Sequence, residues 1–120
     1  MHMALILVID DDPDVRDVLK AALQSAGHEV LLAFDGQSGV QMYRTRPADL
    51  IITDLFMPGQ EGLETIKQLR IEFPDVSIIA ISGKPAGAPM LSVAKHLGAK
   101  AILYKPFLPA ELLTAVEQAL

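Results

Sequence analysis

The chain has 120 residues, of which 51% are hydrophobic and 21% charged; its net charge is −5, and it has no cysteine. This length fits one domain with a substantial core, and the composition excludes an intrinsically disordered chain, a disulfide framework and a thiolate metal site. Its longest apolar run is far shorter than the ~20 residues of a membrane span, and no basic stripe favours direct nucleic-acid binding. We therefore expect a cytoplasmic protein without membrane or nucleic-acid contacts, folded as one domain over residues 1–120, with residues 1–3 resembling a cloning remnant.

Short apolar segments alternate with longer amphipathic segments along the chain. The short segments are rich in Leu, Ile and Val and are apolar on both alternating faces, which is typical of central strands in a parallel sheet. The expected strands are residues 4–9, 30–34, 50–53, 76–81 and 101–104.

The intervening segments carry apolar residues at helical spacing. In chain order these stripes are Val15, Val18, Leu19, Ala22 and Leu23; Val40 and Tyr43; Leu63, Ile66, Leu69 and Phe73; Met90, Val93, Ala94 and Leu97; and Leu112, Leu113, Val116, Ala119 and Leu120. Gly27, Pro74 and Gly98 are expected to end the first, third and fourth helices, whereas Gly39 weakens the prediction of the second, around residues 37–45. The alternation predicts an α/β fold with helices on both faces of a parallel sheet, but it leaves the strand order open.

Polar and charged side chains follow the predicted strands, and the carboxyl ends of parallel strands form one edge, where sites gather. These residues are Asp10, Asp11 and Asp12, Asp54, Ser82, and Lys105. Two carboxylates ~5 Å apart repel by about 3 kcal/mol at an effective dielectric near 20, so the acids need a cation or protonation. A set of oxygen ligands favours Mg²⁺. Taken singly, each residue also has an ordinary structural explanation, and only their joint placement indicates a site.

The three consecutive aspartates are predicted to divide into two roles. Asp12 precedes Pro13, which disfavours helical backbone angles at Asp12 and suits the first helical position itself. Asp12 is therefore expected to cap the first helix, with Asp14 favoured in its first turn. Asp10 and Asp11 remain as the metal candidates.

The chain resembles the receiver domain of two-component response regulators in four segments, which are, in order, ILVIDDDPDVR, ITDLFMPGQEG, IIAISGK and LYKPF. The resemblance covers essentially the whole chain and implies a flavodoxin-like (βα)5 fold with strand order 2-1-3-4-5. It implies a phosphorylation-controlled signalling module, not a turnover enzyme, that is phosphorylated by a histidine kinase or a histidine phosphotransfer protein. The signal would pass to an output domain beyond Leu120, or to a homodimer formed through helix four, strand five and helix five.

Carried over residue by residue, the resemblance also implies the members of the site. Asp54 would accept the phosphoryl group, and Asp10, Asp11 and the main-chain carbonyl of Phe56 would join Asp54 around Mg²⁺. The Ser82 hydroxyl would turn toward the phosphoryl group, and Lys105 would pair with the phosphoryl oxygens. The Lys105–Pro106 peptide would be cis. The kinase would dock on the first helix, through Asp14, Val15, Val18, Ala21 and Ala22.

The sequence departs from the family at two places. Ile102 occupies the position where many receivers carry Tyr or Phe, and Tyr104 is expected on the opposite strand face, so the usual coupling of hydroxyl and aromatic ring is in doubt. Beside the site, residues 83–89 are expected to form a mobile loop. Phe56 and Lys84 are expected to flank the phosphoryl group, with Phe56 restricting the hydrolytic water and prolonging the phosphoryl lifetime.

Two other functions remain as alternatives. One is a small phosphatase or phosphotransferase with Asp10 as nucleophile, since an Asp-x-Asp motif occurs at Asp10 and Asp12. Against it, Asp12 is expected to be a helix cap. The other is a degenerate receiver that binds partners constitutively, against which the complete set of acids, hydroxyl and lysine argues.

Overall fold

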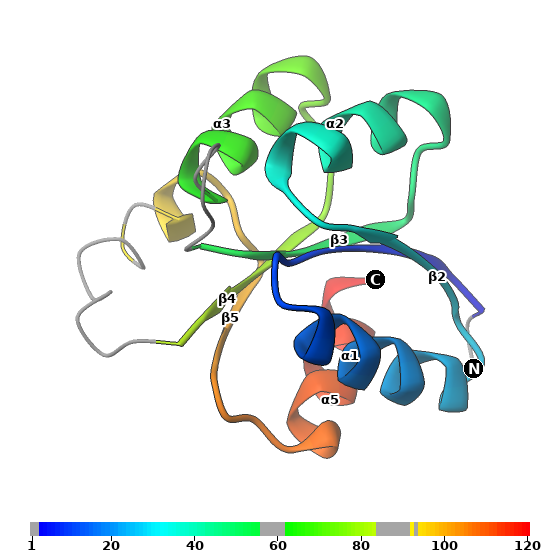
Figure 1. The fold of residues 1–120 in the computed structure, drawn as a ribbon. Helices are drawn as coiled ribbons and strands as arrows, with labels where there is room; N and C mark the ends of the chain where they lie inside the picture. The colour runs from blue at the N-terminus through cyan, green and yellow to red at the C-terminus, as the bar shows by residue number, and fades with distance from the viewer. Residues whose placement is uncertain (1–2, 56–61, 84–91, 93) are drawn as a thin grey trace.

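A central parallel sheet organises the computed structural model, which describes residues 3–55, 62–83, 92 and 94–120 (Figure 1). Its strand order is β2-β1-β3-β4-β5, which confirms the order implied by the family resemblance. The strands are β1 (Leu5–Ile9), β2 (Glu29–Ala33), β3 (Leu50–Asp54), β4 (Ile78–Ser82) and β5 (Ala101–Tyr104).

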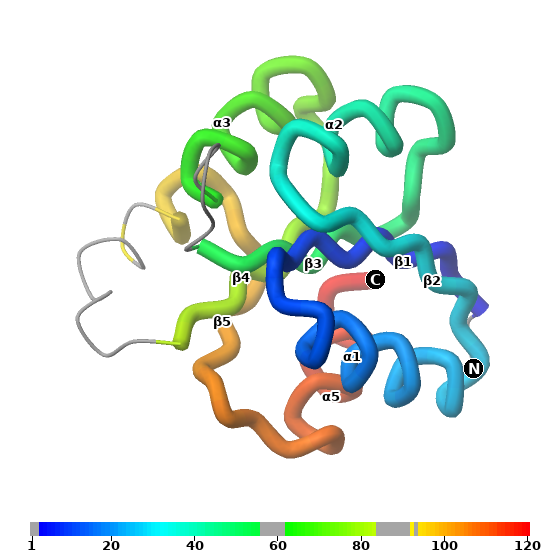
Figure 2. The backbone as a smooth tube through the Cα atoms, in the orientation of Figure 1, coloured from blue at the N-terminus to red at the C-terminus, as the bar shows by residue number. Residues whose placement is uncertain are grey.

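Helices cover both faces of this sheet (Figures 1 and 2). They are α1 (Pro13–Ser25) and α5 (Pro109–Ala119) on one face, and α2 (Gly36–Thr45) and α3 (Gly62–Glu72) on the other. Residues 94–96 are also helical, and the chain leaves them through Gly98, whose φ of 93° confirms the glycine predicted to end this segment. No helix within the described ranges is long and apolar enough to cross a membrane.

The alternation of side chains along β1 divides the core into two layers. Ile6 and Val8 pack in the cluster that includes helix residues of α1 and α5, whereas Leu7 and Ile9 pack in the cluster that includes residues of α2 and α3. Because both faces of the central strands are covered, their sequences are apolar at nearly every position, as the strand prediction assumed.

The first two helices begin at aspartate caps. The Asp12 carboxylate accepts a hydrogen bond from the Asp14 N–H at 2.9 Å, and Pro13 occupies the first helical turn, which confirms the predicted cap. Asp35 caps α2 by accepting from the Ser38 N–H at 2.7 Å. The helix predicted around residues 37–45 therefore begins one residue earlier than expected, at Gly36.

Gly39 lies inside α2 because the helix sits directly on β1. A Cβ atom added at Gly39 would clash with the side chain of Ile9, which is fully buried. The glycine that weakened the helix prediction is therefore explained by close packing of helix and sheet, not by a break in the helix.

Several boundaries and exposures differ from the expectations. Val76 precedes β4, and Phe34 follows β2 with 63% of its surface exposed. Val18 is 60% exposed although its spacing placed it on the apolar stripe, whereas Val15 packs partly against the core. The first helix thus has both a core face and an accessible apolar edge. The expectations for Met90, Val93 and residues 84–89 lie outside the described residues.

Candidate functional site

Three carboxylates gather at the carboxyl edge of the sheet. Asp10 follows β1 and Asp54 ends β3, and these strands are neighbours with Ile9 paired to Thr53. One carboxylate oxygen from each of Asp10, Asp11 and Asp54 lies within 4.8 Å of the others. Asp10 and Asp54 are almost fully buried, and Asp11 is exposed. The predicted division of the aspartates agrees with this geometry, because Asp12 caps α1 and is not part of this group.

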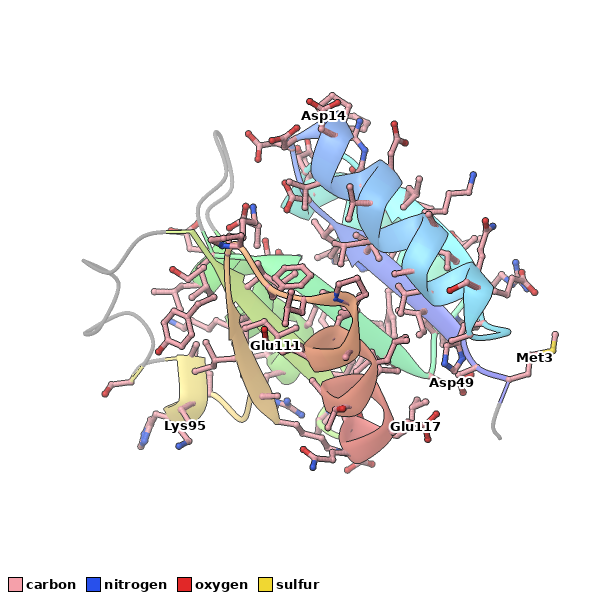
Figure 3. The ribbon with its side chains drawn as sticks, turned by 90° about the horizontal axis from the view of Figure 1, so that it is seen from below. Met3, Asp14, Asp49, Lys95, Glu111 and Glu117 are labelled. Carbon is pink, nitrogen blue, oxygen red and sulfur yellow. The ribbon has the colours of Figure 1, made fainter. Side chains whose placement is uncertain are left out.

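The site lies at the end of the molecule where α1 begins. Figure 3 shows Asp14 at this end of α1, whereas Met3 and Asp49 lie toward the opposite end of the sheet. Asp49 contributes to the fold there, since its Oδ2 accepts a hydrogen bond from the Leu5 N–H at 2.8 Å.

Lys105, directly after β5, supplies a positive charge to the acid group. Its Nζ lies 2.9 Å from Asp54 Oδ2 and 3.2 Å from Asp10 Oδ2. The lysine reaches these acids past the end of β4, where its Cδ lies 3.6 Å from the position of a Cβ added at Gly83. One ammonium thus bridges the two buried carboxylates.

The acid group sets three carboxylates against the single ammonium of Lys105, and two of the three carboxylates are buried. Burial raises the pKa of Asp10, and the nearby Asp54 raises it further, whereas the Asp12 N–H and Lys105 act in the opposite direction without cancelling the rise. Burial alone would lower the pKa of Lys105, but hydrogen bonds and attraction from Asp54 and Asp10 outweigh burial and raise it. A second, divalent cation would offset the remaining negative charge.

Ser82 ends β4 at the same edge and is fully buried. Its neighbour Ile81 is paired with Asp54, and the carbonyl of Ser82 accepts a hydrogen bond from the Lys105 N–H at 2.8 Å. The structure therefore brings the predicted hydroxyl residue next to the strand that carries Asp54 and to the residue that carries the ammonium.

The expectation for Tyr104 is wrong. Ile102 packs against the cluster on the α2 and α3 face, and Leu103 belongs to the opposite cluster, so alternation returns Tyr104 to the face of Ile102. Tyr104 is paired in register with Ser82 and is 54% exposed. An aromatic residue thus stands beside the hydroxyl residue, two positions later in the strand than the family pattern places it.

Gly62 and Arg16 contact the site but were not predicted as site residues. A Cβ added at Gly62 would clash with the main-chain carbonyl of Asp54 and lie 2.5 Å from Leu55 Cα, so the start of α3 packs directly on the end of β3. Arg16 Nη1 donates a hydrogen bond of 2.7 Å to the carbonyl oxygen of Asp10. The signal for Arg16 was its position as the sole basic residue among residues 10–19.

An open cleft adjoins the acid group. It has a volume of about 280 Å³ and is lined by Asp14, Val15, Val18, Lys105, Pro106 and Phe107. The Lys105–Pro106 peptide is cis, which confirms that expectation. The cleft places the apolar edge of α1 beside the lysine. Phe56 and Lys84, which were expected beside the phosphoryl group, lie outside the described part of the chain.

A family model described as the response regulator receiver domain matches residues 6–117. Among curated proteins, the chain is 38% identical over 120 residues to the DNA-binding transcriptional regulator NtrC of Azospirillum brasilense, covering all of this chain and 25% of that protein. It is 31% identical over 115 residues to the response regulator GtcR of Aneurinibacillus migulanus, covering 96% of this chain and 47% of the relative. The chain thus spans about a quarter of one relative and about half of the other.

Solved structures of response regulators also resemble this chain in fold and sequence. The chemotaxis protein CheY4 of Vibrio cholerae superposes with a TM-score of 0.92 and 30% identity over 99% of this chain and 100% of its own. NtrX of Brucella abortus superposes with a TM-score of 0.93 and 30% identity, covering 98% of this chain and 27% of NtrX.

Proposed function

The chain belongs to the response regulator receiver domain family, and from this premise we propose that Asp54 accepts a phosphoryl group from a histidine kinase or a histidine phosphotransfer protein. The observation that carries the assignment is the position of Asp54 itself. Its carboxylate is nearly fully buried at the end of β3, is held by Lys105 at 2.9 Å, and lies within the group formed with Asp10 and Asp11.

In the proposed reaction, a carboxylate oxygen of Asp54 attacks the phosphorus atom of a phosphohistidine. A bond from this oxygen to phosphorus forms, the bond from phosphorus to the imidazole nitrogen breaks, and its electron pair stays on the imidazole. The product is an acyl phosphate on Asp54. Phosphoryl transfer depends mainly on positioning and on neutralising the oxygen charges, and the Lys105 ammonium, which already contacts Asp54, serves both needs.

The acid group fits a divalent cation. Its donors are all oxygen atoms, and burial, together with the charge of Asp54, raises the pKa of Asp10 despite the Asp12 N–H and Lys105. We assign Asp10, Asp11 and Asp54 as the side-chain ligands of Mg²⁺, with the carbonyl of Phe56 as a further ligand carried over from the resemblance. When bound, Mg²⁺ supplies charge neutralisation to the phosphoryl oxygens.

Receiver domains are signalling domains, and we propose that this one switches its partners without acting as a turnover enzyme. A phosphoryl group adds about −1.5 to −2 charge and strong acceptor oxygens, which the Ser82 hydroxyl would meet as a donor and Lys105 as a cation. Ser82 and Tyr104 are register partners, so rearrangement at the hydroxyl would reach the exposed surface of β5 directly. A phosphoryl group shielded by Phe56 would be long-lived, and unchanged decay in Phe56→Ala would contradict this.

Partners are proposed on the same basis. The relatives NtrC and GtcR are longer than this chain, and NtrC is a DNA-binding transcriptional regulator by name. We propose that this receiver signals to an output domain beyond Leu120, or to a second copy through the surface that includes β5 and α5. We propose a cytoplasmic location on the same basis, and the accessible edge of α1 beside Lys105 suits docking of the phosphodonor.

Incubation with Mg²⁺ and acetyl phosphate, followed by intact-mass measurement, tests this function. We expect the mass of one added phosphoryl group in the wild type, none in Asp54→Asn, and retained addition in Asp12→Asn, which alters an acid of the same stretch outside the group. Trapping of the acyl phosphate by borohydride reduction would identify the modified residue. Label on Asp10, or sustained phosphate release from many substrates, would instead support the phosphatase.

A further inference from the structure

The side chain of Arg16 reaches back from α1 to the strand end that carries the acid pair. Its Nη1 donates a hydrogen bond of 2.7 Å to the main-chain carbonyl oxygen of Asp10, and the side chain is half-buried. The acceptor is a main-chain oxygen, so this hydrogen bond does not pair the guanidinium with a carboxylate assigned to the metal.

Arg16 contacts the same turn a second time through its own backbone. The Arg16 N–H donates a hydrogen bond of 3.0 Å to the carbonyl oxygen of Asp12. One residue thus holds the carbonyl groups on both sides of Asp11. The side-chain bond acts on the peptide unit that joins Asp10 to Asp11, and the backbone bond closes the first turn of the helix.

The other bonds of this turn fix different groups. The Asp12 N–H donates to Asp10 Oδ1 at 2.9 Å, which orients the Asp10 side chain, and the Asp12 carboxylate caps α1. Neither bond involves the carbonyl of Asp10. The direction of that carbonyl reports the ψ angle of Asp10, and a change in this angle would turn Asp11 relative to Asp10.

We propose that Arg16 is a positioning residue for the divalent-cation site. By holding the Asp10–Asp11 peptide, it sets the relative direction of the two carboxylates that the proposed function assigns to Mg²⁺. The inference rests on that assignment. Groups that hold metal ligands in place commonly contribute 10- to 100-fold to metal affinity. Because Arg16 acts through the main chain, we expect about tenfold, at the lower end of that range.

A positioning role and a simple charge effect predict opposite signs. A guanidinium beside a cation site repels the cation, so removing its charge alone would tighten Mg²⁺ binding. Removing a group that holds the ligands in place would weaken it. Lys20 offers a matched control, because it lies one turn later in α1, is exposed, and carries the same charge.

The test measures Mg²⁺ affinity without a phosphodonor, by calorimetry and by backbone amide chemical shifts. Wild type, Arg16→Ala, Arg16→Gln, Arg16→Lys and Lys20→Ala are compared, and the melting temperature of each is recorded in EDTA. We expect about tenfold weaker binding in Arg16→Ala and Arg16→Gln. Arg16→Lys should recover much of the loss, since an ammonium can also donate to a carbonyl, and Lys20→Ala should bind as the wild type or slightly more tightly.

Tighter Mg²⁺ binding in Arg16→Ala than in the wild type would overturn the proposal in favour of a charge effect. Affinity in Arg16→Ala equal to that of the wild type would overturn it in favour of a purely structural bond, which a lower melting temperature would accompany. If Arg16→Ala does not fold, Arg16→Gln and Arg16→Lys decide by the same criteria. Absence of Mg²⁺ binding in the wild type would overturn the metal assignment itself, whereas wild-type binding with unchanged Arg16 variants overturns only this inference.

Discussion

At the scale of single residues, the buried carboxylate of Asp10 lowers the stability of the metal-free fold. Its carboxylate is only 1% exposed, and its pKa is raised because burial and the neighbouring Asp54 disfavour the charged form. A raised pKa in the folded state stabilises the fold at low pH, and this contribution is lost as pH rises through the folded pKa. Near neutral pH, ionised Asp10 therefore destabilises the metal-free fold.

We predict that Asp10→Asn stabilises the metal-free protein near neutral pH, by on the order of 1 kcal/mol. Asparagine keeps the oxygen that accepts from the Asp12 N–H but removes the buried charge. The difference from wild type should shrink as pH falls below the ordinary range of aspartate pKa values. Urea unfolding in EDTA across this pH range would measure it, with the exposed Asp17→Asn as control. A destabilised Asp10→Asn, or a pH-independent difference, would contradict the prediction.

At the scale of elements, α1 and α3 hold the acids in place by contacts with the ends of strands. The caps of α1 take Asp12 out of the metal group, and the glycine at the start of α3 lets that helix lie directly against the end of β3. Substitutions at these two contacts can be followed by two measurements each. One measures the free energy of unfolding, and the other measures Mg²⁺ binding or phosphorylation.

For α1, Asp12→Ala should lower the free energy of unfolding by about 1 kcal/mol, and Asp12→Asn by much less, because asparagine is also a good cap. Neither change should weaken Mg²⁺ binding as Asp11→Asn does. Chemical denaturation and Mg²⁺ titration of the three variants would show this. Equal loss of Mg²⁺ affinity in Asp12→Asn and Asp11→Asn would show that the three aspartates do not divide in the way the cap indicates.

For α3, Gly62→Ala should lower the free energy of unfolding by about 1–3 kcal/mol, because the added methyl group overlaps the backbone at Asp54. Since the end of β3 must shift to relieve the overlap, phosphorylation by acetyl phosphate should also become slower. Gly83→Ala is the control, as its Cβ would meet the Lys105 stem at an ordinary 3.6 Å. Equal effects of the two substitutions on unfolding would argue against the close contact.

At the scale of the whole molecule, one group of charges is formed by residues that follow β1, end β3 and follow β5. Cation binding should therefore stabilise the fold globally. We predict that Mg²⁺ at 100 times the wild-type dissociation constant raises the free energy of unfolding of the wild type by about 2.7 kcal/mol. Asp11→Asn should lose most of this gain while changing the metal-free fold little, because Asp11 is exposed. Thermal unfolding with Mg²⁺ and with EDTA would measure both values; an equal gain in Asp11→Asn would exclude Asp11 as a ligand.

The strands and the residues at their ends could be predicted because parallel strands buried on both faces leave continuous apolar runs, and the polar residue that ends each run is visible in the sequence. Other features depend on distances between segments and leave no local pattern. In the sequence, Gly39 indicates only a weak helix, because its close contact with Ile9 leaves no local pattern. Val18 has the spacing of a core residue, yet most of its surface is exposed. Tyr104 lies two residues after Ile102, so strand alternation places both on one face, as the packing of Ile102 and Leu103 on opposite faces shows.

The bridge from Lys105 to Asp10 joins residues 95 positions apart in the chain. During translation, both buried acids leave the ribosome long before the lysine that neutralises them. A nascent chain that has not yet added β5 to the sheet would carry two facing carboxylates without their ammonium. The complete charge group would therefore form only after Lys105 has been synthesised and β5 has joined the sheet, and a copy truncated before β5 would lack the ammonium that contacts both buried acids.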